Sequence, residues 1–129
     1  MILKVFTDGG SKGNPGPSSI GGVGYIEDKK IFEFKKAIGI ATNNDAEYQA
    51  LISALEQILN IKKVTKINFY SDSRLMVNQV KGLFKVNIGR IREYILRIRV
   101  LEQEIALPIT YNYVPREENV EADLLVNSV

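Results

Sequence analysis

The chain has 129 residues, with 17 basic and 15 acidic side chains and a formal net charge of +2. This length suits a single domain with a real core, and the near-balanced charge excludes a strongly basic tail. Cysteine and histidine are both absent, so disulfides, zinc-type Cys/His sites and imidazole catalysis are excluded. Any metal site must use oxygen ligands, which favours Mg²⁺ or Mn²⁺.

Residues 1–129 are therefore expected to form one domain. No apolar run approaches the roughly 20 residues that cross a bilayer, so no membrane association is expected. The first residues, MILKVFTD, are typical of a strand and lack the layout of a signal peptide. A cytoplasmic location follows as an expectation.

The first third of the chain predicts a three-stranded meander. Its β-rich runs cover residues 2–7, 20–26 and 31–38. Between the first two runs, residues 9–17 (GGSKGNPGP) are dense in glycine and proline and predict a long turn. A second turn is predicted over residues 27–30.

A helix and a further strand are predicted next. Asn43 or Asn44 can cap a helix that begins near Asp45. Its apolar residues recur at helical spacing: Leu51, Ile52, Leu55, Ile58 and Leu59. A buried strand over residues 64–70 then leads into Asp72.

The last part of the chain predicts three helices and one strand. A helix over residues 73–80 ends at Gly82, and a longer amphipathic helix covers residues 88–104. The inward-facing residues of the longer helix are Ile91, Ile95, Ile98 and Leu101. A strand over 108–114 and a helix over 117–127 complete the chain. The order β-β-β-α-β-α-α-β-α predicts an α/β fold with a mixed sheet covered by helices.

Acidic residues interrupt apolar patterns at four places: Asp8, Glu47, Asp72 and Asp123. Asp8 and Asp72 follow strands that are expected to be neighbours, so both should project from one edge of the sheet. Glu47 precedes Leu51 by one helical turn and should face the sheet. Asp123 lies between Ala122 and Leu124, where burial is expected.

Each carboxylate also has an ordinary structural explanation. Asp8 can begin a glycine turn, and Glu47 can favour the helix dipole in a first turn. Asp72 can cap a helix, and Asp123 can be a plain helical residue. The convergence of all of them favours a cation site, because close carboxylates repel one another unless a cation neutralises them. Two metal ions about 4 Å apart can promote in-line displacement at a phosphodiester.

Four stretches of the sequence resemble, in order and spacing, the motif blocks of type 1 ribonuclease H: TDGGSKGNPGP, TNNDAEYQAL, FYSDSRLMVNQVKG and VPREENVEADLLVN. The resemblance covers almost the whole chain. It implies a ribonuclease H-like fold, with a five-stranded mixed β-sheet flanked by α-helices. It also implies metal-dependent endonucleolytic hydrolysis of the RNA strand of RNA–DNA hybrids, leaving 5′-phosphate and 3′-hydroxyl ends.

The resemblance assigns roles to individual residues. The family's metal-binding catalytic carboxylates match Asp8, Glu47, Asp72 and Asp123, which implies two divalent cations, Mg²⁺ or Mn²⁺. Positions that contact the hybrid match Gly10, Ser11, Asn14, Thr42, Asn43, Asn44 and Ser73. A basic patch at Lys81 and Lys85 is a further expected contact with nucleic acid. Because backbone contacts carry no base information, cleavage is expected to tolerate any sequence.

One departure from the family pattern concerns Tyr113, which stands where many members carry a histidine. Simple packing is the favoured interpretation of Tyr113, and Arg116, Glu117 or Glu118 are candidates for the missing role.

Two alternatives to the expected function stay open: a DNA-directed nuclease of the same superfold, or a non-catalytic hybrid-binding module. The expected partner is an RNA–DNA hybrid, and a monomer without an obligate protein partner is expected.

Overall fold

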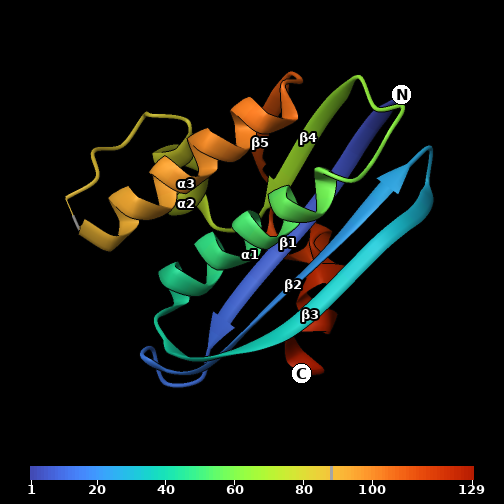
Figure 1. Cartoon of the computed structure of the whole chain (residues 1–129). Helices are drawn as coiled ribbons and strands as arrows, with labels where there is room; N and C mark the ends of the chain where they lie inside the picture. The colour runs from blue at the N-terminus through green and yellow to red at the C-terminus, as the bar shows by residue number, and fades with distance from the viewer. Residues whose placement is uncertain (88) are drawn as a thin grey trace.

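The computed structural model describes residues 1–87 and 89–129. Its centre is a five-stranded mixed sheet in the order β3-β2-β1-β4-β5 (Figure 1). The strands are β1 Ile2–Ser11, β2 Gly16–Ile26, β3 Lys29–Ala41, β4 Lys66–Ser71 and β5 Ile109–Tyr113. The helices are α1 Asn43–Ile58, α2 Arg74–Val80, α3 Gly89–Ile105 and α4 Val120–Asn127, with a short 3₁₀ turn, η1, at Arg116–Glu118. The predicted α/β fold is confirmed.

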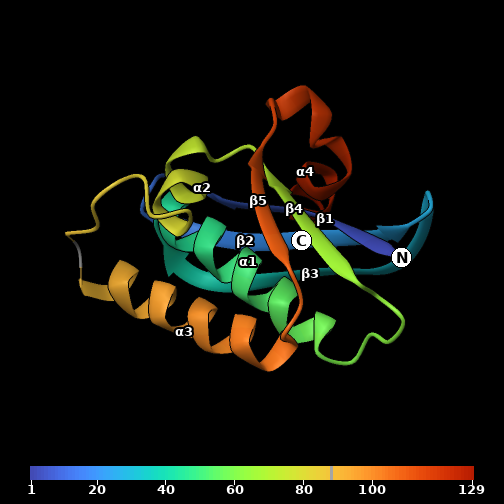
Figure 2. The same ribbon diagram turned by 90° about the horizontal axis from the view of Figure 1, so that it is seen from above.

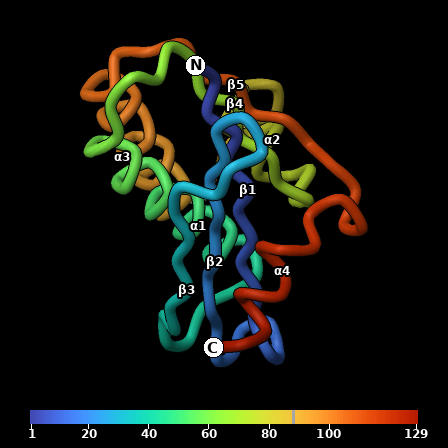
Figure 3. Tube along the Cα trace, turned by 90° about the vertical axis from the view of Figure 1, so that its right-hand side faces the viewer, coloured from blue at the N-terminus to red at the C-terminus, as the bar shows by residue number. Residues whose placement is uncertain are grey.

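The helices form layers on both faces of the sheet. Helices α1 and α3 lie on one side of the sheet and α4 lies on the other (Figures 2 and 3). Strands β1, β2 and β3 are antiparallel, whereas β4 runs parallel to both β1 and β5. Within the described residues, no helix is both long and apolar enough to cross a membrane.

The turn predicted over residues 9–17 is wrong at both ends. Strand β1 continues to Ser11, and β2 already begins at Gly16, because Asp8 pairs with Gly21 and Ser11 pairs with Ser18. Glycine density indicated a turn, but here glycine allows another element to approach the strand. A Cβ atom added to Gly9 would lie 2.4 Å from the carbonyl carbon of Ala46 in α1.

The start of α1 also differs from the prediction. The N-cap is Thr42, and neither Asn43 nor Asn44 takes that position. The Thr42 hydroxyl accepts a hydrogen bond from the Asp45 amide, and the Asp45 carboxylate accepts one from the Thr42 amide. This reciprocal capping box satisfies two amides that would otherwise lack partners. At the other end of α1, Leu59 is 41% exposed, so its predicted place in the apolar stripe is wrong.

The main core lies between the sheet and the helices α1 and α3. Leu51 and Leu55 of α1 and Ile98 and Leu101 of α3 pack with strand residues such as Ile67. Burying each such side chain contributes about 1.5–3 kcal/mol. Of the predicted inward residues of α3, Ile91, Ile98 and Leu101 are buried and Ile95 is partly buried. The predicted start of this helix, residue 88, lies outside the described residues.

A second, smaller cluster lies toward the end of the sheet where α1 begins. It consists of Ile20, Ala46 and Ala50, with Phe34 and Ile38 packed against it. Two of its three buried members are alanines, so α1 lies close to the sheet here.

The helix predicted over residues 117–127 is broken. The 3₁₀ turn η1 comes first, and α4 begins only at Val120. Between them Asn119 has φ −115° and ψ 36°, which departs from helical geometry. Ala122 is buried as expected, but Leu124 is 62% exposed, so its predicted burial is wrong.

Candidate active site

The parallel pairing of β1 and β4 brings two carboxylates to one edge of the sheet. Thr7 of β1 is aligned with Ser71 of β4, so the next residues, Asp8 within β1 and Asp72 directly after β4, lie at the same level of the sheet. Glu47 reaches the same place from the first turns of α1. One carboxylate oxygen from each of these three residues lies within 4.8 Å of the others. The predicted convergence of Asp8, Glu47 and Asp72 is therefore present in the structure.

Asp123 approaches this cluster from α4, on the opposite face of the sheet from α1. It lines the same cleft as Asp8 and Glu47, a hollow of about 410 Å³. Its carboxylate is close enough to Asp8 to help raise the pKa of Asp8. Asp123 thus borders the three-carboxylate cluster but is not among its three closely grouped residues.

Glu47 is oriented by the backbone of β1. The Gly9 amide donates a hydrogen bond of 3.1 Å to Glu47 Oε1. This bond requires α1 to lie close against β1, which the missing side chain of Gly9 allows. A side chain at this position would therefore displace the carboxylate as well as the helix.

Burial and mutual repulsion both disfavour ionisation in the cluster. Burial, followed by the charges of Asp72 and Asp123, raises the pKa of Asp8 to about 8. Burial also raises the pKa of Glu47, and the charges of Asp8 and Asp72 add to the rise. The pKa of Asp72 is raised by burial, while Arg116, with its Nε 3.9 Å from Asp72 Oδ2, opposes the rise.

The donor set fits a hard divalent cation. The grouped ligands are carboxylate oxygens, the type that Mg²⁺ and Mn²⁺ prefer. Among the described residues, no hydrogen-bond donor is paired with the buried Oδ2 of Asp72. A cation at this place would give that oxygen a partner and would relieve the repulsion among the three carboxylates.

We expect the metal-free protein to lose stability as the pH rises from about 4 to about 8. The pKa of Asp8 is 3.8 ordinarily and about 8 in the folded chain. Between these values the folded chain keeps a proton that the unfolded chain has released, so raising the pH favours unfolding. The stabilising contribution is complete below the lower value and is lost at the upper one. Urea unfolding in EDTA at stepped pH measures it.

The other charged groups that face Asp8 act in the same experiment: Glu47, Asp72, Asp123 and Arg116. Saturating Mn²⁺ is expected to remove the decline, because cations bind ionised carboxylates. Asp8→Asn should reduce the decline of the metal-free curve, while the raised pKa of Glu47 keeps part of it. A metal-free stability that rises steadily across this pH range would contradict the assignment.

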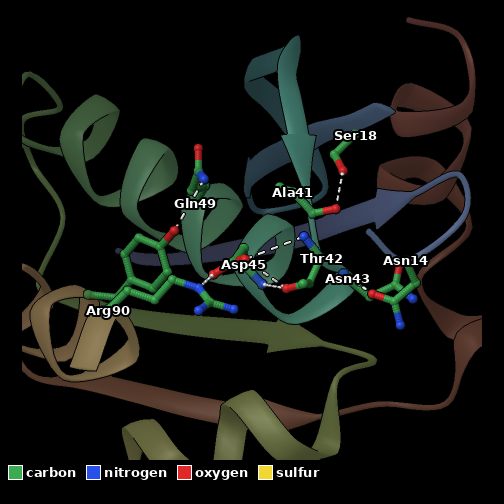
Figure 4. Close-up of polar contacts among 9 residues, drawn as sticks. Asn14, Ser18, Ala41, Thr42, Asn43, Asp45, Gln49 and Arg90 are labelled. Atoms are coloured by element: carbon green, nitrogen blue, oxygen red, sulfur yellow. Dashed lines mark hydrogen bonds and ion pairs between the residues drawn. The ribbon is translucent and has the colours of Figure 1, made fainter. Parts of the chain in front are cut away.

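Hydrogen bonds join two predicted contact residues, Asn14 of the β1–β2 turn (Figure 4) and Ser11 at the end of β1, to Asn43 at the start of α1. The Asn43 amide donates to Asn14 Oδ1 at 2.8 Å, and the Ser11 amide donates to Asn43 Oδ1 at 2.8 Å. The hydroxyls of Ser11 and Ser18 both donate to the Ala41 carbonyl. Gly10, Ser11 and Asn43 line the cleft. The side-chain oxygens of Asn14 and Asn43 therefore accept hydrogen bonds within the protein. Their NH₂ groups can donate to a ligand.

Asp45 and Arg90 form a second part of this network that sequence reasoning missed. Asp45 is 6% exposed, and Arg90 Nε in the first turn of α3 donates to its Oδ1 at 2.7 Å (Figure 4). Burial acts to raise the pKa of Asp45, but hydrogen bonds from Arg90 and Thr42 outweigh it, and the pKa is lowered. The pair ties α3 to the capped start of α1. A Thr with Asp three residues later is a recognisable capping signal. No local sequence pattern indicates that Arg90 pairs with this Asp.

Four further predicted contacts are not among the residues that line the cleft: Asn44, Ser73, Lys81 and Lys85. Ser73 is the N-cap of α2, where its hydroxyl accepts from the Met76 amide at 3.2 Å. Asn44 is half-buried, with no hydrogen-bond partner recorded for its buried Oδ1 among the described residues. Lys81 and Lys85 are exposed after α2, outside the residues that line the cleft.

Tyr113 is aligned with Ser71 of β4 and contacts Arg74. It is 41% exposed, and the Arg74 guanidinium lies 4.6 Å from the centre of its ring. This cation–π contact agrees with the packing interpretation. Among the three candidates for the missing histidine role, Arg116 lines the cleft, while Glu117 and Glu118 are exposed residues of η1.

Solved structures share this sheet and its arrangement of helices. One is LC11-RNase H1 in complex with an RNA/DNA hybrid, with a TM-score of 0.92, 38% identity and coverage of 98% of this chain and 95% of that one. Another is RNase H1 from the halophilic archaeon Halobacterium salinarum, with a TM-score of 0.92, 36% identity and coverage of 99% and 96%. These matches define a protein with the fold of type 1 ribonucleases H.

The family model for RNase H matches residues 2–106. The chain belongs to the RNase H family. Among curated relatives, the bifunctional protein Rv2228c of Mycobacterium tuberculosis is 37% identical over 129 residues, which cover 98% of this chain and 35% of the relative. The chain thus spans about a third of the length of that relative. The family depends on divalent metal ions, and the carboxylate cluster of this chain agrees with that requirement.

Proposed function

We propose that this chain is an endoribonuclease that hydrolyses the RNA strand of RNA–DNA hybrids to 5′-phosphate and 3′-hydroxyl products. The observation that carries the proposal is the grouping of Asp8, Glu47 and Asp72 within 4.8 Å. Two of them, Asp8 and Glu47, line the cleft beside the start of α1. The similar LC11-RNase H1, which was solved with an RNA/DNA hybrid, supports the choice of substrate.

Asp8, Glu47, Asp72 and Asp123 would hold two divalent cations, Mg²⁺ or Mn²⁺. When bound, such ions supply Lewis acidity and an activated water at neutral pH. The protein fixes the carboxylates on rigid elements: Asp8 in β1, Asp72 directly after β4, Glu47 in α1 and Asp123 in α4. The Gly9 amide holds Glu47 in place. Arg116 offsets part of the negative charge at the cleft.

The residues around the cleft would hold the hybrid by its backbone. The NH₂ groups of Asn14 and Asn43, whose oxygens are already engaged, are donors suited to phosphate or sugar oxygens. Gly10, Ser11, Thr42, Asn44 and Ser73 would complete this surface, and Lys81 and Lys85 would add positive charge. Contacts of this kind read no bases, so the proposed cleavage tolerates any sequence. Selectivity for RNA would come from the 2′-hydroxyl.

The proposal takes residues 1–129 as one catalytic domain that acts as a monomer, without a protein partner, in the cytoplasm. The alternatives are a DNA-directed nuclease of the same superfold and a hybrid-binding module without activity. The grouped carboxylates favour a nuclease over a binding module, because repelling buried charges without a cation would destabilise the fold.

Cleavage of an end-labelled RNA–DNA hybrid tests the proposal directly. We expect cutting of the RNA strand alone in Mg²⁺ or Mn²⁺ and none in EDTA, with no cutting of a DNA duplex of the same sequence. Cutting of the DNA duplex would favour the DNA-directed alternative. Retention of the hybrid in a binding assay, without cutting in any metal, would favour the binding module.

A further inference from the structure

Asn119 is a buried polar residue whose side chain does not cap the helix that it precedes. It directly precedes α4 and is 1% exposed. Asparagine at this position commonly caps its own helix with its side chain. Here the side chain makes no cap, and its Nδ2 donates instead to the carbonyl oxygen of Thr7 in β1 at 2.9 Å.

This bond places Asn119 near three carboxylates of the site: Asp8, Asp72 and Asp123. Thr7 immediately precedes Asp8 in β1. The backbone carbonyl of Asn119 accepts from the Asp123 amide at 3.1 Å, in the first turn of α4. Burial raises the pKa of Asp72, and the side chains of Arg116 and Asn119 oppose that rise, so Asn119 also lies beside Asp72.

Packing alone does not account for a buried asparagine here. Among the described residues, its Oδ1 has no hydrogen-bond partner. An unpaired buried polar atom destabilises a fold, and an apolar residue of similar size would avoid that cost. The directional bond to Thr7 distinguishes asparagine from such a residue.

We propose that Asn119 is a positioning residue that sets the start of α4 against β1, and thereby the spacing of Asp8, Asp72 and Asp123 for cation binding. The inference rests on the proposed function, because it assumes that these carboxylates hold metal ions. Residues that orient metal ligands commonly change metal affinity or activity by about 10- to 100-fold when they are replaced. Asn119 touches no reacting atom in this assignment, so its effect would pass through the carboxylates.

The test measures Mn²⁺ binding by calorimetry in the wild-type protein and in Asn119→Ala and Asn119→Ser. Serine remains a favoured N-cap residue, so it protects the fold of α4, but it is too short to replace the bond to Thr7. We expect both variants to bind Mn²⁺ at least about tenfold more weakly. In hybrid cleavage, kcat at limiting Mn²⁺ should fall, while KM for the hybrid stays unchanged.

Asn112→Ala is the matched control. Asn112 lies in β5 of the same sheet, and its Nδ2 donates to the Phe69 carbonyl at 3.0 Å and to Thr110 Oγ1 at 2.9 Å. This variant should lower the unfolding temperature in EDTA and leave Mn²⁺ affinity unchanged.

Wild-type Mn²⁺ affinity in the folded Asn119 variants would overturn the inference. An equal loss of affinity in Asn112→Ala would do the same, because the effect would then belong to the sheet in general. If the wild-type protein cleaves hybrid and binds Mn²⁺, only the role of Asn119 is at stake. If the wild-type protein does neither, the proposed function itself fails, and this inference fails with it.

Discussion

Asp72→Asn is expected to abolish cleavage and to make the metal-free protein more stable. Asparagine keeps the shape of the side chain but removes its charge. Carboxylate-held metal ions contribute several kcal/mol to transition-state stabilisation, so the loss should reach about a thousandfold. Without metal, the Asp72 charge raises the pKa of both Asp8 and Glu47. Removing that charge relieves repulsion within the cluster.

Cleavage rate in Mg²⁺ and the unfolding temperature in EDTA at pH 7.5 to about 8 measure the two effects in one variant. Asp28→Asn is the control, because Asp28 is an exposed carboxylate in the turn between β2 and β3. It should leave both quantities unchanged. Full activity in Asp72→Asn would remove Asp72 from the proposed metal site, and a lowered unfolding temperature in EDTA would contradict the repulsion.

Gly9→Ala is expected to lower the free energy of unfolding by about 3 kcal/mol or more, the upper end of the range for overpacking. The added Cβ atom would lie 2.4 Å from both the carbonyl carbon and the carbonyl oxygen of Ala46. Both are backbone atoms, which cannot rotate away as a side chain can. The start of α1 must therefore move from β1, and the bond between the Gly9 amide and Glu47 lengthens with it.

Urea unfolding measures the loss of stability, and cleavage per folded molecule measures the displacement of Glu47. Gly89→Ala is the control, because no atom lies within 4 Å of the position of its added Cβ atom. Alanine there should preserve stability, because the added Cβ atom meets no other atom. Equal stability of Gly9→Ala and the wild-type protein would show that α1 does not need this close approach.

The grouping of Asp8, Glu47 and Asp72 could be predicted because each step depends on local spacing. The end of an apolar run locates both Asp8 and Asp72, parallel neighbours bring them to one level of the sheet, and one helical turn relates Glu47 to Leu51. Strand β1 itself continues past Asp8 to Ser11, which the apolar run did not indicate. The predicted bounds of the turn, residues 9–17, were wrong because glycine indicates either a turn or a close approach. Only the position of α1, far along the chain, decides between them.

Contacts between distant residues could not be predicted in the same way. The bond from Asn119 to Thr7 joins positions 112 residues apart, and the pair of Arg90 with Asp45 joins positions 45 residues apart. Neither pair has a periodic or local pattern. Asp123 was expected at the site from the family resemblance, but the break before α4 that brings it there had no local signal.

The two apolar clusters give the ends of α1 different tolerance of sequence change. At the far end, large side chains such as Leu55 fill the main core, and related chains can exchange them for others of similar volume. At the site end, Ala46 and Ala50 set how near the helix backbone comes to the sheet. A change of one methyl group there alters the distance between α1 and β1. Substitutions in the main core would therefore change chiefly the unfolding temperature. Substitutions of the two alanines would change chiefly the rate of cleavage.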